Sequence, residues 1–105
     1  MGLLGRLRGR EAADTDDLAR LRAWVGAHHG VEAFVEPRTA VTPTTVLLVD
    51  ADGAWTRGRV TGPAAATRFA RKLRMPVYDA QIVGYPQRMR DHDARERILR
   101  RRRQA

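Results

Sequence analysis

The feature that most constrains the fold is a β-hairpin pattern in the middle of the chain. Thr45–Val49 is a continuous run of β-branched and apolar residues, which is typical of a central strand. Asp50–Gly53 has the composition of a tight turn, and Trp55–Val60 then returns as a second strand. A central strand needs a neighbour on each side, so the remaining residues have to supply a further strand and covering helices.

The segment before the hairpin predicts a helix and a strand. Over residues 14–29 the apolar side chains recur at i, i+3 and i+7, and Gly30 follows where helices often end. Asp14 or Thr15 is the predicted helix cap. Val31–Glu36 alternates apolar and polar residues, which predicts the strand that pairs with the hairpin.

The segment after the hairpin predicts a helix, a fourth strand and a last helix. Pro63 suits the first position of a helix whose buried face is formed by Ala66, Phe69, Ala70 and Leu73. Val77–Val83 is expected to be a strand. Asp91–Arg102 is expected to be a helix with a thin apolar face and acid-first pairs at i, i+4, namely Asp91/Arg95, Asp93/Arg97 and Glu96/Arg100.

The predicted fold class is α+β, with the element order α-β-β-β-α-β and then a basic C-terminal helix. We expect a single domain with an antiparallel meander, helices packed on the sheet, and a fourth strand parallel to one of the others. The predicted divisions are a flexible basic segment at 1–13, the α+β domain at 14–87 and an arginine-rich helix or tail at 88–105. A domain of this size buries only about 60% of its unfolded surface and is marginally stable.

The positive charge lies at the two ends of the chain. The net charge is +8, but residues 11–87 contain nine basic and nine acidic residues. Residues 1–10 contain three arginines, and residues 88–105 contain eight arginines against three acidic residues. We therefore expect a neutral domain whose cationic ends bind an anionic partner.

The chain lacks the residues that several kinds of functional site require. The chain contains no cysteine and no serine, which argues against disulfides, thiolate zinc sites and acyl-transfer nucleophiles. Neither a dinucleotide-binding nor a phosphate-loop motif is present. His28 and His29 are adjacent, so on a helix their side chains diverge by about 100° and do not share one ion. We expect no catalytic residue, no metal ligand and no cofactor.

The predicted element order is shared with two known folds. In the restriction-endonuclease-like core the third strand carries an acid and a lysine, whereas Trp55–Arg57 contains neither. Thr45–Leu73 looks like the hairpin and second helix of the double-stranded RNA-binding domain, which has phosphate-binding lysines where that helix begins. Pro63–Ala66 is uncharged there. The chain departs from both patterns, and we predict that it is not an enzyme.

Two segments resemble a known family as sequence. They are Val31–Thr39, which reads VEAFVEPRT, and Ala70–Asp91, which reads ARKLRMPVYDAQIVGYPQRMRD. Together with the Met-Gly-Leu-Leu start they are similar to a family of short actinobacterial proteins with no established function. The resemblance implies a bacterial cytoplasmic protein and brings no catalytic or binding residues.

The leading functional hypothesis is a small non-enzymatic module that docks on RNA, DNA or a ribonucleoprotein through its arginines. The candidate nucleic-acid-binding residues are Arg88, Arg90, Arg95, Arg97, Arg100, Arg101, Arg102 and Arg103, with a second patch formed by Arg57, Arg59 and Trp55. One alternative is a protein-interaction domain, whose strands extend a partner's sheet or its own dimer and whose tails are solvated or bind an acidic protein. Another is peripheral binding to an anionic membrane, in which Leu3, Leu4 and Leu7 insert beside arginines of residues 1–10.

Overall fold

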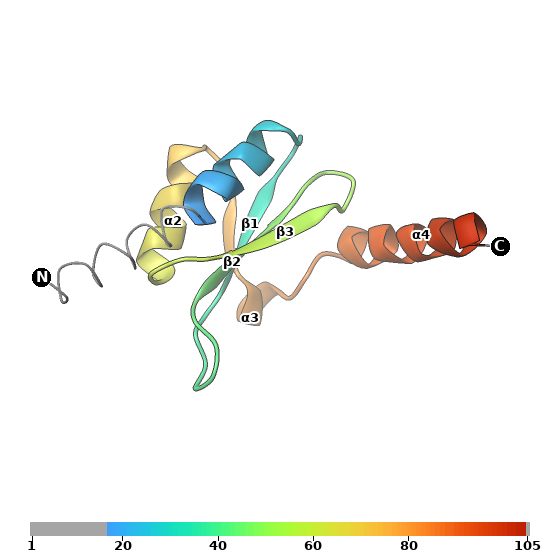
Figure 1. The fold of residues 1–105 in the computed structure, drawn as a ribbon. Helices are drawn as coiled ribbons and strands as arrows, with labels where there is room; N and C mark the ends of the chain where they lie inside the picture. The colour runs from blue at the N-terminus through green and yellow to red at the C-terminus, as the bar shows by residue number, and fades with distance from the viewer. Residues whose placement is uncertain (1–16, 105) are drawn as a thin grey trace, which may run out of the picture.

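The four strands form one mixed sheet in the order β3-β2-β1-β4. The structure is a computed structural model and describes residues 17–104. The strands are β1 (Glu32–Glu36), β2 (Thr45–Val49), β3 (Trp55–Arg59) and β4 (Val77–Asp79). Both β1 and β3 run antiparallel to β2, which places β2 inside the sheet. The mixed α+β class is confirmed, and Figure 1 shows the sheet between the helices.

The hairpin turn forms because Asp50 satisfies the amides of the residues that follow it. Its Oδ1 atom accepts hydrogen bonds from the backbone N–H groups of Asp52 (2.9 Å) and Ala54 (3.0 Å). Gly53 has φ of +93°, a conformation that other residues rarely adopt. The turn therefore lies where the composition of Asp50–Gly53 predicted it.

The fourth strand is shorter than predicted. β4 pairs with β1 in parallel but ends at Asp79, and Ala80–Val83 forms the short helix α3. The Asp79 carboxylate caps this helix by accepting a hydrogen bond from the amide of Gln81 at 2.8 Å. The prediction of a strand over Val77–Val83 is thus wrong in its second half, because a local side-chain cap competes with the strand pattern.

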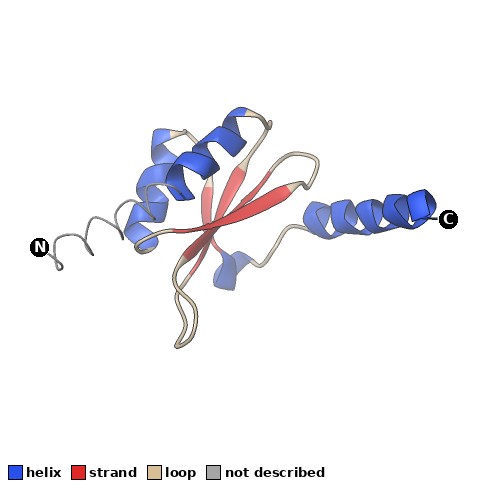
Figure 2. Cartoon of the chain, viewed as in Figure 1, coloured by secondary structure: helices blue, strands red, loops and turns tan. Residues whose placement is uncertain are grey.

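The first helix and α2 (Pro63–Lys72) cover one face of the sheet, as Figures 1 and 2 show. The first helix spans residues 17–26 within the described part, so it ends before the predicted residue 29, and the predicted caps Asp14 and Thr15 lie outside the described residues. Their shared core includes Leu21 at 0% exposure and Phe69 at 5%. The helix-facing side of the sheet is therefore fully packed.

The opposite face of the sheet has a smaller apolar cluster. Phe34, Leu47 and Val49 are buried there, together with Ala80 of α3 and the half-buried Met89. Met89 belongs to α4 (Gln87–Gln104), which starts earlier and ends later than the predicted Asp91–Arg102. α4 has no buried residue and projects away from the sheet (Figure 1). None of the helices in the described residues is both long and apolar enough to cross a membrane.

Candidate functional site

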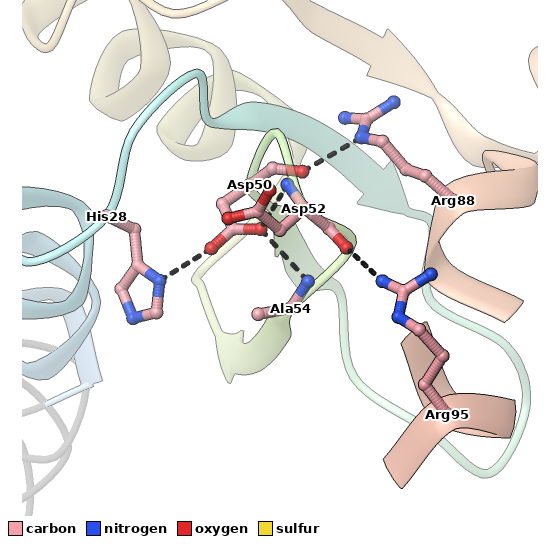
Figure 3. A network of polar contacts seen from close by, with 6 residues as sticks. All are labelled: His28, Asp50, Asp52, Ala54, Arg88 and Arg95. Atoms are coloured by element: carbon pink, nitrogen blue, oxygen red, sulfur yellow. Dashed lines mark hydrogen bonds and ion pairs between the residues drawn. The ribbon is translucent and has the colours of Figure 1, made fainter. Parts of the chain in front are cut away.

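The first half of α4 is fastened to the hairpin turn. Arg88 donates from Nε to the carbonyl oxygen of Asp50 at 2.8 Å and from its terminal nitrogen to Glu32 at 2.6 Å. Two turns further along the helix, Arg95 donates to the carbonyl oxygen of Asp52 at 3.0 Å. Figure 3 shows both arginines reaching the same turn from one side. These two predicted binding residues therefore position the helix.

Two further contacts bring α4 close to the hairpin. The Trp55 indole N–H donates to the Asp93 carboxylate, with distances of 3.0 and 3.3 Å to its two oxygens. At Gly53, a Cβ atom would lie 2.0 Å from the carbonyl oxygen of Arg88. Only glycine allows this approach without a shift of the helix. The sequence predicts Gly53 as a turn residue, but no local pattern indicates its contact with a helix that starts more than thirty residues later.

Asp50 anchors the turn from its other side. Its Oδ2 atom lies 2.7 Å from Nδ1 of His28, and the His28 ring stacks on Trp24 with centroids 3.7 Å apart. Burial raises the pKa of Asp50, but the hydrogen bonds from His28 and from two backbone amides outweigh it, and the pKa is lowered overall. The pair thus joins the end of the first helix to the turn that supports α4 (Figure 3).

The predicted second basic patch is largely paired with carboxylates. Arg57 donates to both oxygens of Glu36, at 2.6 and 3.0 Å, and this contact raises the pKa of Arg57. Arg59 lies 3.7 Å from the Asp17 carboxylate, and Trp55 is held by α4. Arg57, Arg59 and Trp55 therefore lie on one strand face as predicted, but much of the positive charge is neutralised locally.

A cavity of about 690 Å³ lies beside this patch, between α3 and the loop that follows β1. Glu36 lines it and accepts hydrogen bonds from Thr45, Arg57 and Tyr85. Burial raises the pKa of Glu36, and these bonds more than reverse the shift, so the pKa is lowered. Because its lone pairs are already used inside the fold, Glu36 is a structural anion and a poor ligand-binding group.

The last two turns of α4 are different. Arg97 and Arg100–Arg103 are exposed, and no hydrogen bond or ion pair joins their side chains to any described residue. The predicted pair Asp91/Arg95 does not form, since Asp91 accepts from Gln87 and Arg95 bonds to the hairpin turn. The other two predicted pairs are also not seen in the described part of the chain, and Arg90 donates to Gln87. Arg97 and Arg100–Arg103 are hereafter called the basic end.

The exposed edge of β3 is partly covered by the first helix. The Val60 amide donates to the Thr44 carbonyl oxygen at 3.1 Å, and the Ala54 carbonyl oxygen accepts from the Asp50 amide at 2.9 Å. Because hydrogen bonding alternates along an antiparallel strand, the backbone groups of Arg57 and Arg59 point away from β2. The Arg59 amide donates to Asp17 at 3.0 Å, and the Arg57 carbonyl accepts from Arg20 at 2.7 Å. These bonds occupy the positions that an added strand would need.

No family model, curated protein or solved structure matches this chain. The resemblance to short actinobacterial proteins stays a prediction.

Proposed function

We propose that this protein binds nucleic acid through the basic end of α4. The observation behind the proposal is the contrast within one helix. Arg88 and Arg95 bond to the domain, whereas Arg97 and Arg100–Arg103 project into solvent with no described partner. Because hydrogen bonds hold the first half of α4 against the domain, the second half projects and keeps five guanidinium groups away from the carboxylates of the domain. These groups are therefore available to bind phosphates.

The arrangement of these arginines favours a ligand that contacts several sides of the helix over a flat surface. Consecutive helical residues are separated by about 100°, so Arg100, Arg101, Arg102 and Arg103 point to all sides of the helix. A bilayer surface contacts only one side of such a helix. A nucleic acid can place phosphates on several sides of the helix, as a flexible single strand does when it wraps around it and as the two backbones beside a major groove of roughly 12 Å do.

The protein-interaction alternative has less support from the sheet edges. Contacts from Asp17 and Arg20 occupy outward-facing backbone groups of β3. The other edge strand, β4, has three residues, which gives an added strand few bonds. The membrane alternative depends on Leu3, Leu4 and Leu7, which lie outside the described residues.

The test is binding of a fluorescently labelled oligonucleotide followed by anisotropy at several salt concentrations. If Arg100–Arg103 each neutralise one phosphate of duplex DNA, log K falls with log salt with a slope of about −3.6. Single strands give a slope of about −2.8 for four contacts. Replacing all four arginines by alanine should flatten the slope towards zero and leave at most about −0.9 on duplex DNA, from Arg97. Because these contacts carry no base information, the duplex affinity should hardly vary with sequence.

The matched control removes the same charge from the domain. Arg22, Arg38, Arg68 and Arg71 are exposed and lie outside α4, and their joint replacement by alanine should leave the salt slope unchanged. An equal loss of affinity in the control would show that net charge, and not the basic end, drives binding. Binding to vesicles of anionic lipid but not to oligonucleotides would favour the membrane alternative and overturn the proposal.

A further inference from the structure

The three most exposed aromatic side chains of the described residues all belong to the second face of the sheet or its border. Trp55, Tyr78 and Tyr85 are 36%, 37% and 41% exposed. Each ring is nevertheless held by a hydrogen bond to a carboxylate. Trp55 bonds to Asp93, as described above, while Tyr78 donates to Glu32 at 3.0 Å and Tyr85 donates to Glu36. An exposed ring with a fixed orientation can stack on a ligand at a small entropic cost.

Two of these rings line one small cavity. The cavity between Tyr78 and Tyr85 has a volume of about 210 Å³ and is called here the tyrosine slot. Phe34 also lines it and lies against Tyr78, with ring centroids 5.4 Å apart. The volume is below the roughly 300 Å³ of pockets for drug-sized ligands, so the slot suits a single planar ring system.

The charges around the tyrosine slot balance each other. Arg88 lines the slot, and its bond to Glu32 offsets the nearest negative charge. The carboxylate hydrogen bonds are the main cause of the raised pKa of both tyrosines, so their hydroxyl groups stay neutral donors at physiological pH. The tyrosine slot is therefore lined by aromatic rings, neutral hydroxyl groups and the Arg88 guanidinium, whose charge is balanced by Glu32.

The tyrosine slot lies at the root of α4. Only Pro86 separates Tyr85 from the first residue of that helix. At 1.5 Å per residue, the distance along the helix from Gln87 to Arg101 is about 21 Å. Single-stranded ligands occupy about 4–16 nucleotides on comparable binding modules, so one strand can reach both the slot and the basic end.

We propose that the tyrosine slot binds an unpaired nucleobase and that the preferred ligand is therefore single-stranded nucleic acid. The inference rests on the proposed function, to which it adds the class of nucleic acid. Stacking of one base on an aromatic side chain strengthens binding by about 5- to 150-fold and tolerates any base, because every base has a π face. Phosphates on either side of the stacked base then lie near the start of α4.

The test measures three ligands: a ten-residue oligothymidine, an abasic strand of the same length, and a duplex of that length. Wild-type protein should bind oligothymidine more tightly than both the abasic strand and the duplex, and tighter binding to the duplex would contradict the preference for single strands. The double variant Tyr78→Leu/Tyr85→Leu should lose about 5-fold or more in affinity for oligothymidine and keep its affinity for the abasic strand. Tyr78→Phe/Tyr85→Phe keeps the rings but removes the hydrogen bonds that orient them, so it should still prefer oligothymidine to the abasic strand and lose less affinity than the leucine variant.

Thermal unfolding of each variant separates loss of the slot from loss of the fold. If the double leucine variant unfolds, Tyr78→Leu alone and the wild-type comparison of the two strands still decide the question. Equal wild-type affinity for oligothymidine and the abasic strand would overturn the nucleobase slot. If the variant lacking Arg100–Arg103 loses binding while the leucine variants do not, the proposed function stands and only the slot is wrong.

Discussion

Replacing Gly53 by alanine tests whether α4 rests directly on the hairpin turn. The added Cβ atom would lie 2.0 Å from the Arg88 carbonyl oxygen and 2.9 Å from Cβ of His92, where ordinary contacts are 3.4 Å or longer. The backbone also has φ of +93°, which costs an L side chain about 1–2 kcal/mol. The start of α4 must therefore move away from the turn.

The displacement also removes the contacts that fasten the helix. Arg88 would lose its hydrogen bonds to the Asp50 carbonyl and to Glu32, each worth about 0.5–1.5 kcal/mol. With the backbone strain, we expect Gly53→Ala to lower the free energy of unfolding by about 2–5 kcal/mol. Urea denaturation followed by circular dichroism measures this loss.

Gly84 provides the matched control. It also has a positive φ, +72°, but a Cβ atom there meets no other atom within 4 Å. Gly84→Ala should therefore cost only the backbone strain, which is about 1–3 kcal/mol for its φ of 72° and ψ of −172°. If Gly53→Ala destabilises the protein no more than Gly84→Ala, the close contact between the turn and α4 is wrong.

The remaining predictions concern the core, one helix end and acid stability. Phe69→Ala should cost about 3–5 kcal/mol, because the ring is 5% exposed in the helix-facing core, and an unchanged thermal melt would contradict that packing. Arg74→Gly should stabilise the protein by about 1 kcal/mol in urea denaturation, because Arg74 follows the Leu73 cap of α2 with φ of +56°; a loss of stability would contradict this. In the folded protein the pKa values of Asp50 and Glu36 lie below their ordinary values of 3.8 and 4.5. Both carboxylates therefore stabilise the fold when the pH is above these ordinary values. Urea denaturation should show that this contribution is lost as the pH falls below them. Asp50→Asn should reduce this acid dependence, and an unchanged pH profile would show that the Asp50 contacts contribute nothing.

Local patterns were sufficient to predict most of the sheet and its main helices. Thr45–Val49 is β2 with the predicted bounds, because its apolar residues are buried between two neighbouring strands. Pro63 opens α2 as expected, and its predicted apolar face is buried except for the half-buried Leu73. Each of these features depends on residues close together in the chain.

The features that the sequence did not reveal depend on distant or competing contacts. Arg88 bonds to Glu32 across 56 positions, and no spacing rule connects the two. The sequence of Val77–Val83 reads as a strand, but the Asp79 side chain favours a helical turn at α3. The arginines of α4 look equivalent in the sequence. In the fold, Arg88 and Arg95 are hydrogen-bonded to the hairpin turn, whereas those of the basic end are exposed.

The most direct test of the central claim is a titration of isotope-labelled protein with a single-stranded oligonucleotide, followed by amide chemical shifts. We predict that the largest shifts fall on residues 96–104, with further shifts at Tyr78 and Tyr85. The exposed basic stripe on α2, formed by Arg68, Arg71 and Lys72, should change little. Largest shifts on that stripe, or no shifts along α4 at saturation, would contradict binding through the basic end.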